Sequence, residues 1–244
     1  MSKRVPVKTL ELYLIRHGET SGNAGTFREP DEHEQDPYLN ERGRRQADLV
    51  GKRMAALALD AVFASGLERA VDTAARIARQ QPENGCRTVS ILPILCENGV
   101  RADYPGHSLA YYRQKYPVTV AGGVDGDSLI FASEGFDDTA LYAKGEQAIR
   151  YFCERFTHGE KVAAVAHGGF NTFLLLAAMR VRPENMVFDV DFYNTGVTKI
   201  IFYDEHGGNY GEQTKVAFLN DTSHLYEEFP SFGFYDDPAR PSQG

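Results

Sequence analysis

The chain lacks tryptophan and has few cysteines, only three among its 244 residues. Cys86, Cys96 and Cys153 are odd in number and lack the spacing of a metal pair, which predicts reduced structural thiols rather than disulfides or a zinc site. No apolar run in Met1 to Thr9 reaches signal-peptide length, and nowhere is an uninterrupted apolar stretch long enough to span a membrane. The default expectation is a cytoplasmic protein without a membrane partner.

The chain also lacks an excess of positive charge. Lysine and arginine number 26 against 34 acidic residues, which gives a formal net charge of −8. This balance argues against a general nucleic-acid or membrane-surface binder. No proline-rich, repeated or low-complexity segment divides the sequence, and a hydrophobic content of 42% indicates a globular protein.

Short apolar strands alternate with amphipathic helices along the chain. The pattern predicts strands near 10–16, 60–64, 88–92 and 161–166, and helices near 42–57, 66–80, 137–157 and 168–180. Such alternation predicts an α/β fold, a three-layer α/β/α sandwich with a mainly parallel central sheet. Thr195 to Tyr203 and Thr214 to Leu219 are expected to form a late hairpin.

Two of the expected strands end in histidine followed by glycine. The first ends in Arg16-His17-Gly18, and the second in His167-Gly168-Gly169, which leads directly into an apolar helix. Sites in open α/β sheets gather beyond the carboxyl ends of strands, so these side chains are expected near one another. A lone histidine at a strand end is more often a satisfied polar residue than a nucleophile, and only the combination of blocks favours chemistry.

A third block follows the strand near 60–64. Ser65 and Glu68 have the spacing of a capping box, which places Arg69 in the first turns of a helix, near its positive end. Taken alone, Arg69 would be read as a solvated helix residue.

Together these blocks resemble the histidine phosphatase superfamily, which includes cofactor-dependent phosphoglycerate mutase. The resemblance runs from about Leu10 to Leu225 and implies a single domain over 1–244 with a phosphoglycerate mutase-like fold. It is carried by these matches: Arg16 to Thr20 with Asn23, Leu39 to Gly43 with Gln46-Ala47, Ser65 to Ala74, Glu97, His167 to Gly169, and Asn220 to Leu225.

The resemblance implies a role for each matched residue. His17 would be the nucleophile that forms a phosphohistidine, with its other ring nitrogen bound to a backbone carbonyl. Arg16, Asn23, Arg69 and His167 would bind the phosphoryl group. Glu97 would protonate the leaving group and then activate water; Glu134, Asp103 and Glu19 are rival carboxylates for this role. No metal or other cofactor is expected.

Two segments are too long for plain connections. Residues 98–135 are expected to form a cap over the site, and Tyr104, Tyr111, Tyr112 and Arg113 are its candidate substrate contacts. The acidic stretch 29–36 has two interpretations at this stage: a wall of the substrate site, or surface elaboration. The tail 226–244 is expected to be irregular, with Phe229, Phe232, Phe234 and Tyr235 packed on the body. His224 is expected to be structural.

Three functions are open at this stage. The first is a metal-independent phosphatase for a small phosphorylated metabolite. The second is a phosphoglycerate mutase, although the chain lacks the tryptophan-containing pattern and the substrate block typical of those mutases. The third is a non-catalytic phosphate-binding module. Phosphoprotein substrates and a homodimer are also left open.

Overall fold

The computed structural model describes residues 5–26, 34–126, 128–207 and 213–229. Within them, seven strands form one sheet in the order β4-β3-β2-β5-β1-β6-β7. The strands are β1 (Lys8–Arg16), β2 (Ala61–Ala64), β3 (Val89–Ile91), β4 (Val118–Val120), β5 (Glu160–Ala166), β6 (Val197–Tyr203) and β7 (Thr214–Asp221). The strands from β4 to β1 run parallel, and β6 and β7 form an antiparallel pair at one edge.

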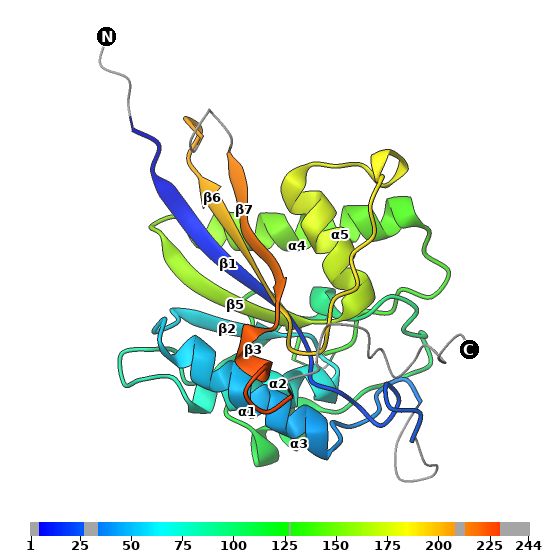
Figure 1. Ribbon diagram of the computed structural model, residues 1–244. Helices are drawn as coiled ribbons and strands as arrows, with labels where there is room; N and C mark the ends of the chain where they lie inside the picture. The colour runs from blue at the N-terminus through cyan, green and yellow to red at the C-terminus, as the bar shows by residue number, and fades with distance from the viewer. Residues whose placement is uncertain (1–4, 27–33, 127, 208–212, 230–244) are drawn as a thin grey trace, which may run out of the picture.

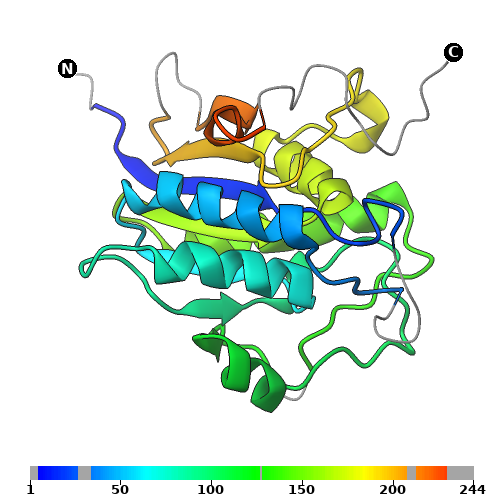
Figure 2. The same ribbon diagram turned by 60° about the horizontal axis from the view of Figure 1, so that its bottom comes forward.

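Helices cover both faces of this sheet (Figure 1). The α-helices are α1 (Glu41–Ala55), α2 (Glu68–Arg79), α3 (Leu109–Lys115), α4 (Asp138–Arg155) and α5 (Gly168–Met179), joined by the short 3₁₀ turns η1 (Pro93–Leu95), η2 (Pro183–Asn185) and η4 (Ser223–Leu225). Helices α1 and α2 lie side by side across one face, as Figure 2 shows, and α4 packs on α5 across the other. The predicted three-layer sandwich with a mainly parallel sheet is confirmed.

The central strand β1 is apolar on both sides because both faces of the sheet are covered. Leu10, Leu12 and Leu14 belong to the core beneath α4 and α5. Tyr13 and Ile15 alternate with them and belong to the second core, beneath α1 and α2. This double burial fixes the strand firmly, so the residues that follow Ile15 leave the sheet from a rigid base.

The segment 98–135, which is expected to form a cap, contributes regular elements to the fold. It contains α3 and also β4, which pairs in parallel with β3 and extends the sheet by one strand. Both elements are short, so no sequence periodicity distinguishes them from a loop.

The expected capping box at the start of α2 is wrong. The N-cap residue is Leu67, which offers no capping side chain. The side chain of Asp36 caps the helix instead: its carboxylate accepts hydrogen bonds from the backbone N–H groups of Glu68 at 2.6 Å and Arg69 at 3.5 Å. A cap supplied by a distant loop satisfies the same donors, and sequence spacing within the helix does not reveal it.

Other expectations concern the hairpin, the tail and the membrane. The late hairpin is confirmed as β6 and β7. In the tail, Phe229 lies beneath the Arg42 guanidinium, whereas Phe232, Phe234 and Tyr235 lie outside the described residues. Among the described helices, none is long and apolar enough to cross a membrane.

Candidate active site

The two strand-end histidines meet at the carboxyl edge of the sheet. β1 and β5 are neighbours, and their register pairs Arg16 with Ala166, so His17 and His167 leave the sheet side by side. Their ring centroids are 5.1 Å apart with the planes tilted by 57°. Residues 150 positions apart in the sequence therefore share one site, as the strand pattern predicts.

His17 is buried and held in one orientation. Its Nδ1 lies 2.7 Å from the Gly18 carbonyl oxygen, so Nδ1 carries the proton and Nε2 bears the lone pair. Burial lowers the pKa of His17 well below its ordinary value, and the charges of Arg69 and Arg16 lower it further. The ring is therefore neutral at physiological pH, the state required of a nucleophile. The acceptor is the backbone carbonyl that the resemblance implies.

Ser65 holds His167 in the complementary orientation. The Ser65 hydroxyl lies 2.7 Å from His167 Nε2, and its oxygen also accepts the Leu67 N–H at 3.3 Å. Burial lowers the pKa of His167 well below its ordinary value, with Arg69 and His17 adding to the effect, so the ring is neutral. If the hydroxyl donates to Nε2, the ring proton lies on Nδ1. This Nδ1 is buried and has no hydrogen-bond partner, so it can donate to a bound anion.

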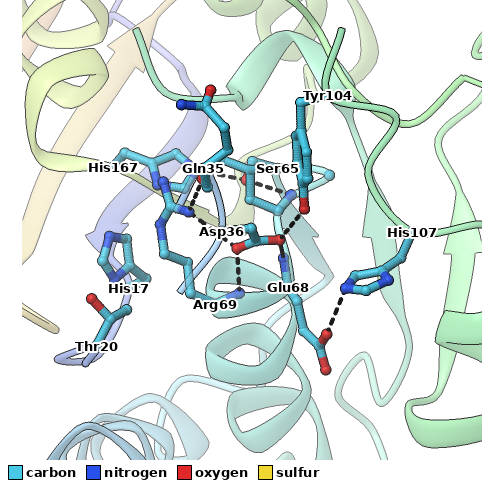
Figure 3. A network of polar contacts seen from close by, with 12 residues as sticks. His17, Thr20, Gln35, Asp36, Ser65, Glu68, Arg69, Tyr104, His107 and His167 are labelled. Carbon is cyan, nitrogen blue, oxygen red and sulfur yellow. Dashed lines mark hydrogen bonds and ion pairs between the residues drawn. The ribbon is translucent and has the colours of Figure 1, made fainter. Parts of the chain in front are cut away.

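Arg69 is held at the site by the loop that precedes α1. Its Nη1 donates to the Gln35 carbonyl at 2.9 Å and to Asp36 Oδ1 at 3.0 Å. The side chains of Arg69 and Asp36 are both buried. Figure 3 shows the Asp36 carboxylate joining Arg69 to the N-terminus of α2 and to the Tyr104 hydroxyl, which lies 3.4 Å from Oδ2. Since Nη1 makes these bonds, Nε and Nη2 are the groups of Arg69 left to bind a phosphoryl oxygen.

Arg16 is anchored by a different segment, the one that precedes β6. Its Nη1 donates to the Phe192 carbonyl at 2.6 Å. A Cβ on Gly168 would lie only 3.3 Å from Arg16 Nε, and one on Gly169 would lie 3.0 Å from Glu97 Oε1. The paired glycines therefore let an arginine and a carboxylate approach the N-terminus of α5 together, which explains this motif physically.

Glu97 lies at the same helix end. Its Oε1 accepts the backbone N–H groups of Asn98 and of Phe170, each at 3.0 Å. The Ser133 hydroxyl donates to the Glu97 backbone carbonyl at 3.0 Å. Because both donors bind Oε1, Oε2 is the oxygen available for proton transfer.

The side chain of Asn194 links Asn23 to the backbone of His17. Its Oδ1 accepts the Thr20 N–H at 3.1 Å and the Asn194 side-chain amide at 3.3 Å. Asn194 also donates to the His17 carbonyl at 2.9 Å. Because the side-chain oxygen of Asn23 accepts these hydrogen bonds, its side-chain nitrogen is the atom left to donate one, as a neutral donor.

The four candidate substrate contacts of the cap fall into different places. Tyr104 binds Asp36 and so lies next to Arg69. Tyr111 donates to Glu68 at 2.7 Å, and Tyr112 is fully buried with its hydroxyl on the Gly66 carbonyl. The Tyr112 hydroxyl thus holds residues 98–135 to the turn before α2, and a contact of Tyr112 with substrate stays a prediction. Arg113 is exposed.

Sequence reasoning missed the residues that position the others. Ser65 was interpreted as a helix cap, Asp36 as part of an acidic loop, and Asn194 was not singled out. No local signal pairs Asp36 with Arg69, because the two residues are 33 positions apart in the sequence. Of the acidic stretch, Glu34 and Asp36 are described, whereas Glu29, Asp31 and Glu32 are not. Over the ranges that the structure describes, no group of three or more His, Cys, Asp or Glu is placed to hold a metal ion.

His224 has the structural position expected of it. Its Nε2 lies 3.1 Å from the Thr195 hydroxyl, and its Nδ1 faces Arg53 at 3.3 Å. The Thr195 N–H in turn donates to the Arg16 carbonyl at 3.0 Å. The residue thus supports the backbone beneath the site without entering it.

Known proteins are similar to this chain in sequence and in fold. The chain is 30% identical to the metal-independent phosphoserine phosphatase of Arabidopsis thaliana, over 98% of this chain and 92% of that protein. It is 28% identical to phosphoglycerate mutase-like protein 4 of the same plant, over 93% and 92%.

Among solved structures, a mutant phosphoserine phosphatase from Entamoeba histolytica in complex with phosphoserine matches with a TM-score of 0.59 at 24% identity, over 88% of this chain and 99% of that one. The mycobacterial glucosyl-3-phosphoglycerate phosphatase in complex with VO3 matches with a TM-score of 0.61 at 21% identity, over 86% and 98%. These two structures support the fold. The family model of the histidine phosphatase superfamily (branch 1) matches residues 12–210, and the chain belongs to this superfamily.

Proposed function

We propose that the protein is a metal-independent phosphatase that hydrolyses a small phosphorylated metabolite through a phosphohistidine on His17. The observation that carries this proposal is the orientation of the two buried histidines. The Gly18 carbonyl fixes His17 with Nε2 as the lone-pair nitrogen, and Ser65 leaves His167 with Nδ1 directed away from its own support. One ring can attack phosphorus while the other donates to a phosphoryl oxygen.

The first step is transfer of the phosphoryl group to His17. Nε2 attacks phosphorus in line with the leaving oxygen, while Arg16, Arg69, Asn23 and His167 donate to the three equatorial oxygens. Glu97 gives its proton from Oε2 to the departing alkoxide, so a neutral alcohol leaves. The guanidinium groups of Arg16 and Arg69 supply the positive charge that the transition state requires.

The second step is hydrolysis of the phosphohistidine. Glu97, now a carboxylate, accepts a proton from a water molecule that attacks phosphorus, and His17 leaves as neutral imidazole once more. Inorganic phosphate is the second product. Each residue thus returns to its starting protonation state.

A mutase is the second candidate because one relative is named a phosphoglycerate mutase-like protein. Both enzymes would form the same intermediate, so the acceptor decides: water in a phosphatase, the substrate's own hydroxyl in a mutase. We expect stoichiometric phosphate release, with isotope from labelled water entering the phosphate, and negligible interconversion of 2- and 3-phosphoglycerate. Efficient interconversion primed by a bisphosphoglycerate, with little phosphate release, would make the mutase correct.

The substrate class is tested with a panel of phosphorylated metabolites that includes phosphoserine and glucosyl-3-phosphoglycerate, the molecules named for the relatives. We further propose a cytoplasmic location, which the free thiols of Cys86, Cys96 and Cys153 support. A homodimer stays a prediction that sedimentation would test.

The covalent step has a direct test. His17→Ala should abolish turnover, because no neighbouring group can replace Nε2 as nucleophile, while wild-type enzyme quenched during turnover should carry acid-labile phosphate on His17. His158→Ala, which alters an exposed histidine just before β5, at the opposite edge of the sheet from His17, is the matched control. Activity retained by His17→Ala would contradict the mechanism.

A further inference from the structure

A buried lysine lies outside the phosphate-binding residues. Lys144, on α4, is only 2% exposed. Lysine is almost never fully buried unless its charge is paired. Here no ion pair with an acidic side chain is found for Lys144 within the described part of the chain, and its Nζ donates to the backbone carbonyl of Cys96 at 2.6 Å. Packing alone does not explain why a charged group is buried here with a backbone carbonyl as its hydrogen-bond partner.

The surroundings of Lys144 retain its charge. The ammonium lies 4.1 Å from the centre of the Phe170 ring and 5.1 Å from that of Phe131. Aromatic faces attract cations, and the effect is larger where water is excluded. Burial lowers the pKa of Lys144 to about 8, a shift opposed by the Cys96 and Glu97 side chains, so the group is still largely protonated at neutral pH.

Lys144 holds the peptide that leads into Glu97. The carbonyl it binds belongs to Cys96, the preceding residue, while Ser133 holds the carbonyl of Glu97 itself. Phe170 links the two groups, since its ring faces the ammonium and its N–H binds Glu97 Oε1. The backbone on both sides of Glu97 is therefore fixed, and so is its Oε1. Oε2 is the carboxyl oxygen that is left for proton transfer.

We propose that Lys144 is a positioning residue for Glu97, which it fixes through the Cys96 carbonyl and whose carboxylate form its positive charge stabilises. The inference rests on the proposed function of Glu97 as the general acid. When Glu97 passes its proton to the leaving oxygen, it becomes a carboxylate whose charge interacts with that of the buried ammonium, and their attraction favours that step. Lys144 keeps its own protons throughout.

The test combines two single variants with the double variant. Lys144→Met preserves much of the volume but removes the donor and the charge, and Glu97→Gln removes the acid. Each is assayed on an alkyl ester, phosphoserine, and on an aryl ester, p-nitrophenyl phosphate, whose leaving group hardly needs a proton. Lys161→Met is the matched control, because Lys161 donates to the Leu57 carbonyl at 3.0 Å at the opposite end of β5.

We expect Lys144→Met to lower kcat on the alkyl ester about 10- to 100-fold, within the range for general-acid catalysis, with little change in KM or in aryl ester hydrolysis. In the Glu97→Gln background the same change should have almost no further effect, because coupled residues are not additive. Equal losses on both esters, or additive losses in the double variant, would overturn the inference.

Two further results separate the possible failures. Glu97→Gln alone should harm the alkyl ester about 10²- to 10⁴-fold more than the aryl ester. If it does not, the acid role itself is wrong, whatever Lys144 does. Lys144→Gln keeps a donor without the charge and provides a second folded variant should the methionine variant unfold. It should fall between wild type and Lys144→Met on the alkyl ester, and an unchanged kcat would count against the role of the charge.

Discussion

At the scale of single residues, the candidate site depends on groups that hold the proposed phosphoryl-binding residues in place. Ser65 holds His167, Asp36 holds Arg69, and the Gly18 carbonyl holds His17. Each hydrogen bond fixes the orientation of the side chain it holds. His17 and His167 are both neutral and buried, yet their protons lie on nitrogens selected by different partners. The same residue type thus serves two roles because its supports differ.

Ser65→Ala tests the support of His167. Without the hydroxyl, Nε2 loses its hydrogen-bond partner and the ring can carry its proton there, which leaves Nδ1 unable to donate to the phosphoryl group. Loss of one such bond corresponds to about 1–3 kcal/mol, so kcat/KM should fall by about 5-fold to 150-fold. The measurement is steady-state hydrolysis of an aryl phosphate.

Ser90→Ala is the control for that variant, since Ser90 is a strand residue whose hydroxyl contacts Thr119 at the surface. It should have wild-type activity. Wild-type kinetics in Ser65→Ala would show that His167 needs no fixed tautomer.

At the scale of elements, a single carboxylate joins the expected cap, residues 98–135, to the helix that carries Arg69. Glu68 begins α2, directly before Arg69, and accepts hydrogen bonds from three side chains of the cap: Tyr111 at 2.7 Å, Lys115 at 2.8 Å and Tyr116 at 3.0 Å. His107 Nε2 also lies 3.1 Å away. The cap helix α3 and α2 are therefore joined next to a candidate catalytic arginine, and any movement of the cap would act on α2.

Glu68→Gln should loosen this junction. The amide has no charge to pair with Lys115 and only one oxygen to serve four donors, so we expect the free energy of unfolding to fall by about 1–3 kcal/mol. Hydrogen exchange should quicken in residues 107–116 before it does so in β1. Glu83→Gln, at an exposed position, should change neither quantity. Unchanged exchange in the cap would mean that α3 is held by its apolar contacts alone.

The sequence predicts the long elements of this fold well and its short ones poorly. The boundaries expected for the four main strands and four main helices fall within about two residues of those observed, since their apolar periodicity is strong. The strand β4 has only three residues and offers no period to detect. Of the site, His17, His167, Arg16 and Glu97 lie in contiguous motifs. Asp36 and Ser65 act on residues distant in sequence, so only the folded chain reveals their partners.

At the scale of the whole molecule, buried ionisable groups make stability depend on pH. Burial lowers the pKa of His224 to about 4, aided by the charge of Arg53. Burial opposes ionisation of Glu11 and Glu68, but hydrogen bonds from their partners outweigh it and lower each pKa to about 2. All three shifts favour the form that predominates at neutral pH.

The direction of this dependence follows from linkage. The stabilisation due to His224 is present above its unfolded pKa of 6.5 and is lost as the pH falls toward about 4. That due to Glu11 and Glu68 is present above 4.5 and is lost as the pH falls toward about 2. Urea unfolding measured at descending pH should therefore show stability declining first below about 6.5 and more steeply below about 4.5. Constant or rising stability on acidification would contradict these assignments.

The place of β5 in the sheet has a consequence for the synthesis of this protein. β5 lies between β2 and β1 although it follows both along the chain. While a ribosome extends the polypeptide, the gap between those two strands must wait for residues 160–166, and a sheet that closed without them would be misfolded. His167, the residue that follows this strand, joins His17 only once β5 is in place. We therefore expect a chain that ends before residue 167 to lack activity, because it has neither β5 nor His167.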